Sequence, residues 1–182
     1  VALTPETTKK LTALGARVTL VSGPVTQPDP PGVTVVRVES AREMLAACQA
    51  ALPADGAICN AAVADWRTAR AADQKMKKVP GAVPPPLELA LNPDILATLS
   101  AAGLTRPRLV VGFAAETEKV IENAVAKRAR KGCDWIVAND VSGDVMGGLE
   151  NTVHLVTEAG VEDWPRMAKE EGGGSLTALP VI

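Results

Sequence analysis

The chain has 182 residues, of which 47% are hydrophobic and 22% charged, and its formal net charge is −2. This length fits one domain with a buried core, and the near-neutral charge argues against a nucleic-acid-binding protein, because no basic stripe dominates. No apolar run approaches the roughly 18 residues that cross a bilayer, and no basic segment followed by an apolar one opens the sequence. We therefore expect a cytoplasmic protein without a membrane partner.

Apolar runs alternate with helical patterns along the chain, which is typical of βαβ units. The expected helices cover residues 5–14, 41–51, 93–102 and 117–131. The expected strands cover residues 17–21, 33–38, 56–59, 87–91, 109–113, 134–138 and 151–157, after at most one short strand at 1–4. This order predicts an α/β fold, in which a single domain holds a Rossmann-like, mostly parallel sheet with helices on both faces. We expect the domain to span residues 1–171, and residues 172–182 to form a glycine-rich, linker-like segment and tail.

Three helices carry clear signals at their ends. Ser40 is expected to cap the second helix. The third begins with Asn92 as the capping residue, Pro93 at the first helical position and Asp94 against the helix dipole, and it ends at Gly103. Thr117 begins the fourth, and Gly132 stops it. The residues of the fourth helix expected to face inward are Val120, Ile121, Ala124 and Val125.

The sulfur and imidazole groups offer little chemistry. Three cysteines, Cys48, Cys59 and Cys133, lie far apart, which favours reduced buried thiols over a disulfide frame or a zinc site. His154 is the only histidine, and the alternating run around it predicts a surface strand position without a partner. A mechanism that needs a histidine base therefore has one poor candidate.

The stretch 58–78 is the centre of the predicted site. Small residues follow a buried strand and lead to an acid at Asp65, and three lysines come next, at positions 75, 77 and 78. Prolines at 80, 84, 85 and 86 exclude regular structure beyond them. Small residues let a ligand approach the backbone, and lysines on a mobile loop can close over an anion. The stretch predicts a nucleotide site with a lysine lid.

Other candidate residues lie at the expected carboxyl ends of the parallel strands, where ligands bind in open α/β sheets. The acids there, which could bind magnesium or ribose hydroxyls, are Asp65, Asp94, Glu116 and Asp140. Asp94 and Glu116 could equally serve only the starts of helices. Lys127 and Lys131 share one helix face and suit either a bound phosphate or the helix dipole. Neither the dinucleotide-binding glycine fingerprint nor a P-loop occurs.

Six motifs occur in the order seen in phosphopantothenate–cysteine ligases, and the chain resembles that family over about residues 15–169. The motifs are Asn60-Ala-Ala-Val-Ala-Asp65-Trp66, Lys75-Met-Lys-Lys78, Asn92-Pro-Asp-Ile95, Val111-Gly-Phe-Ala-Ala-Glu-Thr117, Lys127-Arg-Ala-Arg-Lys131 and Ala138-Asn-Asp140. In bacteria, members usually form the C-terminal half of a bifunctional coenzyme A biosynthesis protein. The resemblance implies a homodimer, and a decarboxylase domain in the full-length protein.

The resemblance also implies a reaction. CTP and Mg²⁺ activate the carboxylate of 4′-phosphopantothenate as an acyl-cytidylate with release of pyrophosphate, and the amine of cysteine then displaces CMP. By motif, Lys75 is the catalytic residue at the phosphates or the acyl-cytidylate, and Lys127 and Lys131 meet the triphosphate. The residues that would hold the nucleotide or line its pocket are Ala61, Ala62, Asp65, Asn92, Pro93, Asp94, Ile95 and Phe113. No residue is assigned to the metal, and the sequence does not decide whether the nucleotide is CTP or ATP.

The front of the chain departs from the family pattern. The family's opening strand and its Asn-x-Ser-Ser-Gly segment are not in the sequence, and residues 4–14 stand in their place, so residues 1–14 are atypical. Residues 1–14 instead resemble the start of alanine dehydrogenases, which makes an NAD-dependent dehydrogenase one alternative. A second alternative is a nucleotide-binding form that does not turn over.

Overall fold

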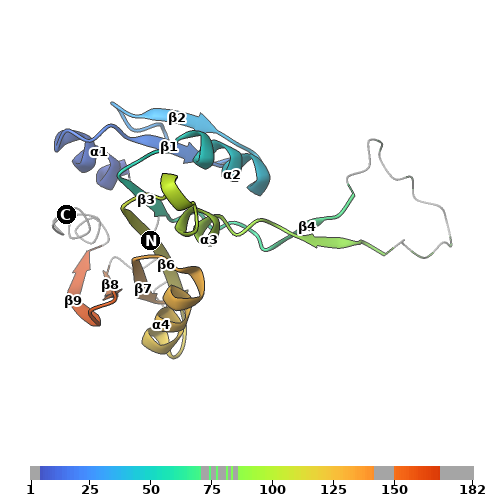
Figure 1. Ribbon diagram of the computed structural model, residues 1–182. Helices are drawn as coiled ribbons and strands as arrows, with labels where there is room; N and C mark the ends of the chain where they lie inside the picture. The colour runs from blue at the N-terminus through green and yellow to red at the C-terminus, as the bar shows by residue number, and fades with distance from the viewer. Residues whose placement is uncertain are drawn as a thin grey trace.

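The computed structural model describes residues 5–70, 74, 77, 81, 83, 86–141 and 150–168, so the predictions for 1–4 and 172–182 lie outside the described residues. The predicted α/β fold is confirmed (Figure 1). The main sheet has five strands in the order β3-β6-β7-β8-β9. Its members are β3 (Gly56–Cys59), β6 (Leu109–Glu116), β7 (Trp135–Asp140), β8 (Glu150–Val156) and β9 (Val161–Ala168).

This sheet is mixed, because its two halves are connected differently. The chain between β3 and β6, and the helix α4 (Val120–Lys131) between β6 and β7, allow parallel pairing. A tight turn joins β8 to β9, in which the Thr157 amide donates to the Gly160 carbonyl at 2.9 Å, and β7, β8 and β9 pair antiparallel. Strand β9 was not predicted from the sequence.

Two further strand pairs lie outside this sheet. Strands β1 (Thr19–Ser22) and β2 (Thr34–Arg37) pair parallel, next to helices α1 (Pro5–Ala13) and α2 (Ala41–Ala50) (Figure 1). Strand β4 (Trp66–Thr68), which was not predicted, pairs antiparallel with β5 (Leu89–Leu91). This second pair projects from the body of the domain (Figure 1).

Buried apolar side chains lie on both faces of the five-stranded sheet, because successive side chains of the buried strands β6 and β7 point to opposite faces. One cluster faces α4 and α3 (Ile95–Ser100) and contains Leu96, Val110, Ala114, Ala124, Cys133, Ile136, Ala138 and Val156. The other cluster contains Val111, Val137, Val153, Leu155 and Trp164. None of the helices among the described residues has the length and apolar character to cross a membrane.

The predicted cap of α2 is confirmed. The Glu43 amide donates to the Ser40 hydroxyl, and the Glu43 carboxylate accepts from the Ser40 amide, which makes a full capping box. The predicted start of α3 is wrong by two residues, because Asp94 caps the helix and Asn92 instead bonds another loop. The helix also ends earlier, at Ser100, and Gly103 opens the short 3₁₀ helix η1 (Gly103–Thr105).

Three predictions about the second half of the chain are corrected. Helix α4 begins at Val120 rather than Thr117, because β6 continues to Glu116. Ile121 and Val125 do not face inward, since 40% and 46% of their surfaces are exposed. His154 is not without a partner, because its Nδ1 lies 2.6 Å from Asp163 Oδ1 on the neighbouring strand.

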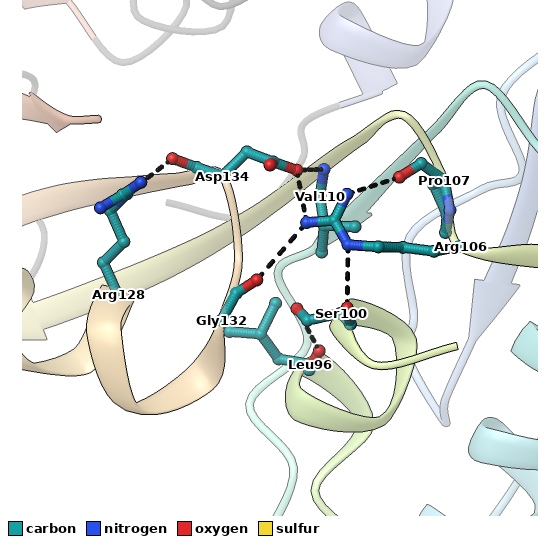
Figure 2. A network of polar contacts seen from close by, with 8 residues as sticks. All are labelled: Leu96, Ser100, Arg106, Pro107, Val110, Arg128, Gly132 and Asp134. Atoms are coloured by element: carbon teal, nitrogen blue, oxygen red, sulfur yellow. Dashed lines mark hydrogen bonds and ion pairs between the residues drawn. The ribbon is translucent and has the colours of Figure 1, made fainter. Parts of the chain in front are cut away.

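A polar network fixes the C-terminal ends of α3 and α4 against the starts of β6 and β7 (Figure 2). Arg106 Nη2 donates to Asp134 Oδ2 at 2.9 Å, and the same oxygen accepts from the Val110 amide at 2.7 Å. Arg128 Nε donates to the Asp134 carbonyl at 2.8 Å. The guanidinium of Arg106 also donates to the carbonyl oxygens of Ser100, Pro107 and Gly132. The network thereby holds the C-terminal ends of the two helices at the first residues of β6 and β7.

Candidate functional site

The predicted site forms around a step in the sheet, where β3 ends and β6 continues. The last register pair between these strands is Cys59 with Gly112, and β6 runs on to Glu116. The chain leaves the sheet after Cys59 as the loop 60–65, in which Ala61 and Ala62 are exposed. Small side chains at this edge leave the backbone accessible to a ligand.

Asn92 ties this loop to the segment that precedes α3. Its Nδ2 donates to the Ala64 carbonyl at 2.7 Å, and its backbone amide donates to the Asp65 carbonyl at 2.8 Å. The structure therefore brings together two predicted segments, 60–65 and 92–95, that lie about thirty residues apart in the sequence. The Asp65 side chain is exposed beside this contact.

Lys127 reaches the step from α4. Its Nζ donates to the Phe113 carbonyl at 2.7 Å, one residue beyond the last pair between β3 and β6. Because an ammonium has three donors and this partner is neutral, Lys127 keeps its positive charge available to an anion at the rim. The predicted neighbours Lys127 and Phe113 thus lie together.

Lys131, one turn further along α4, makes a different contact. Its ammonium forms an ion pair with the Asp94 carboxylate at the start of α3, and 21% of the Lys131 side chain is exposed. Asp94 also caps α3, because its Oδ1 accepts from the Ala97 amide at 3.0 Å. Partial burial by itself raises the pKa of Asp94, but the hydrogen bonds from Lys131 and Ala97 outweigh it and hold this pKa below its ordinary value.

Gly112 lets α3 lie directly on β6 and so sets the position of Asp94. A β-carbon at Gly112 would lie 2.5 Å from Leu96 Cδ2 and 2.8 Å from Ile136 Cδ1. Both side chains belong to the buried cluster under α3 and α4. The glycine in the Val111-Gly-Phe run therefore has a packing reason.

Asn139 is a candidate that the sequence analysis did not include among the nucleotide-binding residues. It is 6% exposed on β7, in register with Ala115, and its Oδ1 has no hydrogen-bond partner within the described part of the chain. A buried polar atom left unpaired costs about 1–3 kcal/mol, so Asn139 Oδ1 needs a partner beyond the described residues. The available signal was an asparagine at the end of an apolar strand.

Two carboxylates at the ends of β6 and β7 suit a magnesium ion carried by a triphosphate. Glu116 and Asp140 are register partners, so their side chains leave neighbouring strands on the same face. Mg²⁺ typically takes one or two carboxylates together with phosphate oxygens. No group of three or more His, Cys, Asp or Glu side chains fit to hold a metal by itself occurs among the described residues.

A shallow pocket of about 410 Å³ lies beside the site rather than in it. Its lining includes Asn92 and Pro93, but not Phe113, Lys127 or Lys131. We place the candidate site at the step in the sheet, because Lys127 and the loop of exposed small residues lie there. Burial raises the pKa of the half-buried Cys59 thiol at the end of β3 to about 12, so this thiol is neutral near pH 7.

Comparison with known proteins identifies the family. The model of the DNA/pantothenate metabolism flavoprotein C-terminal domain matches residues 6–179 of the chain. The chain belongs to this family. The match begins within α1, so it includes most of the segment 1–14 that we expected to be atypical, and it contradicts the dehydrogenase alternative.

Curated relatives of this flavoprotein C-terminal domain are coenzyme A biosynthesis bifunctional proteins CoaBC. The chain is 44% identical over 160 residues to the protein of Escherichia coli K12, which is 86% of this chain and 39% of that protein. It is 45% identical over 180 residues to the protein of Mycobacterium bovis, which is 92% of this chain and 42% of that protein. The chain thus spans about two fifths of the length of these relatives.

Solved structures agree with the family assignment. The crystal structure of the C-terminal domain of a coenzyme A biosynthesis bifunctional protein CoaBC matches 98% of this chain and 80% of that chain, with a TM-score of 0.77 and 32% identity. A DNA/pantothenate metabolism flavoprotein from Streptococcus pneumoniae has a TM-score of 0.76 over 97% of this chain and 86% of that chain, at 18% identity, which supports the fold alone.

Within this flavoprotein C-terminal domain, the structure gathers most of the predicted site residues and leaves others untested. The residues at or beside the step are Ala61, Ala62, Asp65, Asn92, Pro93, Asp94, Ile95, Phe113, Lys127 and Lys131. Lys75 and Lys78 lie outside the described residues, and Lys77 is exposed. The role of each residue toward a nucleotide remains a prediction.

Proposed function

We propose that this domain ligates 4′-phosphopantothenate to cysteine at the expense of CTP, as a step of coenzyme A biosynthesis. The family and the names of the CoaBC relatives support the pathway. The observation that carries the reaction is the Lys127 ammonium at the Phe113 carbonyl, beside the exposed loop of small residues. A cation at this accessible step in the sheet can neutralise part of the charge of a bound triphosphate.

The reaction has two steps. A carboxylate oxygen of 4′-phosphopantothenate attacks the α-phosphorus of CTP, forming an acyl-cytidylate and releasing pyrophosphate. The amine of cysteine then attacks the acyl carbon, an amide bond forms, CMP leaves and the amine loses a proton. In the first step, two anionic groups must approach each other, so catalysis depends on positioning and on cations at the phosphates.

The residues at the step divide this work. Lys127 and Lys131 neutralise the phosphates, and Lys75 would contact the reacting groups. Ala61 and Ala62 leave room for the nucleotide against the backbone. The buried carboxamide of Asn139 and the ring of Phe113 belong to neighbouring strands and offer the base or ribose a hydrogen-bonding group and an apolar surface. Bound Mg²⁺ would supply further charge neutralisation, with Glu116 and Asp140 as its protein ligands.

The same proposal covers the surroundings of the domain. The relatives are named bifunctional, and the chain spans about two fifths of their length, so we place a decarboxylase activity in the part that it does not span. We also propose a cytoplasmic homodimer as the working form.

Release of pyrophosphate from CTP tests the reaction directly. We expect release when CTP, Mg²⁺ and 4′-phosphopantothenate are present, and CMP once cysteine is added. Omission of the acid substrate is the control, because a contaminating phosphatase would release phosphate without it. If CTP raises the melting temperature while neither pyrophosphate nor CMP forms, the domain binds nucleotide without turnover, and the ligase assignment is wrong for this chain.

A further inference from the structure

The two lysines assigned to the triphosphate have partners of different charge in the ligand-free protein. Lys127 donates to a neutral carbonyl, whereas Lys131 is paired with the carboxylate of Asp94, which lies 37 residues earlier in the chain. Among the described residues, an anion that arrives at the step therefore meets one cation bound to a neutral carbonyl and one cation paired with a carboxylate. A phosphate that binds Lys131 therefore comes close to the Asp94 carboxylate, which repels it.

Asp94 is well placed to fix the Lys131 ammonium. One of its oxygens accepts from the Ala97 amide at 3.0 Å, which anchors the carboxylate at the start of α3, and the other contacts Lys131. Helix α3 is itself held on β6 by the contact over Gly112 and by the Arg106 network at its far end. The carboxylate is thus held by a helix that is packed on the sheet, while the Lys131 side chain has four rotatable bonds between its backbone and its ammonium.

We propose that Asp94 is a positioning residue for Lys131. Its carboxylate holds the Lys131 ammonium in place in the ligand-free protein, and the ammonium moves to the phosphates when the nucleotide binds. The inference rests on the proposed function, in which Lys131 meets the triphosphate. The carboxylate and the phosphates compete for one ammonium and repel each other, so Asp94 weakens binding of the nucleotide. Because Asp94 fixes the position of the Lys131 ammonium, it also favours the arrangement of the phosphates in the transition state over other bound arrangements.

Replacing Asp94 by asparagine separates these effects. Asparagine caps a helix about as well as aspartate, so α3 keeps its start while the negative charge is removed. We expect Asp94→Asn to bind CTP about tenfold more tightly by calorimetry and to release pyrophosphate about tenfold more slowly at saturation. A purely structural role would lower stability, affinity and turnover together. Weaker or unchanged CTP binding in a folded Asp94→Asn protein would overturn the proposal.

A double-mutant cycle tests whether the effect passes through Lys131. Lys131→Met should weaken CTP binding, and Asp94→Asn added to it should change the affinity by less than about twofold. Arg130→Met is the matched control, because it removes a cation from the same helical turn, whereas the ion pair of Asp94 is formed by Lys131. Equal gains from Asp94→Asn in the wild-type and the Lys131→Met backgrounds would show that Asp94 acts without Lys131.

The ion pair can be tested without a nucleotide. We expect the pKa of Asp94, followed by carboxyl carbon NMR, to rise in Lys131→Met and to rise less in Arg130→Met, because Arg130 acts on the carboxylate through its charge alone whereas Lys131 also donates a hydrogen bond. The same value in all three proteins would remove the pair and the proposal. These outcomes differ from failure of the proposed function, which would appear as wild-type protein that releases no pyrophosphate while the Asp94–Lys131 pair is still measured by NMR.

Discussion

At the scale of single residues, Lys127 offers the most direct test of the site. Its contact with the Phe113 carbonyl places one positive charge at the step between β3 and β6. A charged hydrogen bond to a phosphate is worth about 1.5–3 kcal/mol, so we expect Lys127→Met to weaken CTP binding at least about tenfold in calorimetry. Lys10→Met, on an exposed position of α1, is the control and should leave affinity unchanged. Unchanged CTP affinity in Lys127→Met would mean that this lysine interacts with the dipole of α4 and does not bind the nucleotide.

The cysteines give a pH-dependent prediction. Burial raises the pKa of Cys59 to about 12, and it also raises the pKa values of Cys48 and Cys133. Because Cys59 has its lower, ordinary pKa in the unfolded chain, its neutral thiol stabilises the fold fully below about pH 9, and this contribution is lost as the pH rises toward 12. At pH 8 we expect a thiol reagent to label Cys59 slowly in the native protein and faster after unfolding in guanidinium. Rapid native labelling of Cys59 at pH 8, read by mass spectrometry, would contradict this burial.

Residue types predicted which segments lie together better than they predicted the contacts between those segments. Small residues, lysines and acids at strand ends predicted segments that the fold brings together, because the ends of parallel strands meet at one edge. The pair between Lys131 and Asp94 could not be foreseen, since it joins two helices 37 residues apart. Asn139 was part of the Ala138-Asn-Asp140 motif but was given no role, because its unpaired Oδ1 is visible only once β6, β7 and β8 are assembled.

At the scale of elements, the network around Asp134 is expected to hold the frame of the site. Its carboxylate accepts from Arg106 and from the Val110 amide (Figure 2). Asp134→Ala leaves both donors without this partner, so we expect the free energy of unfolding to fall by about 2–3 kcal/mol in urea. Glu88→Ala is the matched control, since its pair with Arg70 is 3.6 Å long and both side chains are mostly exposed. That change should cost less than about 0.5 kcal/mol.

Similar losses in Asp134→Ala and Glu88→Ala would mean that the network adds no more than an exposed ion pair. A further check is catalytic, because loosening the far ends of α3 and α4 should also lower CTP affinity in Asp134→Ala. Glu88→Ala should not change it.

The elements that sequence could predict are those with one dominant physical signal. The β-branched run of β2, the capping box of α2 and the left-handed Gly132 after α4, with φ of 66°, are of this kind. Strand β4 has only three residues, and its pairing with β5 depends on a chain segment more than twenty residues away. Strand β9 carries two acids and a proline, a pattern that an edge strand tolerates and that sequence alone reads as a loop.

At the scale of the whole molecule, the candidate site exists only in the folded chain. It draws on the loop after β3, the start of α3, the middle of β6 and the end of α4. A nucleotide that binds this assembly therefore binds the folded state alone, and it stabilises the protein by mass action. The formal net charge of −2 gives no general attraction for anions, so any such stabilisation must come from local cations.

Thermal unfolding can measure this coupling. At about one hundred times its dissociation constant, CTP with Mg²⁺ should add about 2.7 kcal/mol, which corresponds to a rise in melting temperature of roughly 5–10 °C for a chain of this size. Cytidine carries the same base and ribose without phosphates, so it should give a much smaller rise at equal concentration. Salt should reduce the effect of CTP, since the lysines at the rim remain partly exposed to solvent. Equal shifts from cytidine and CTP would show that the phosphates do not reach Lys127 and Lys131, and the site would have to be placed elsewhere.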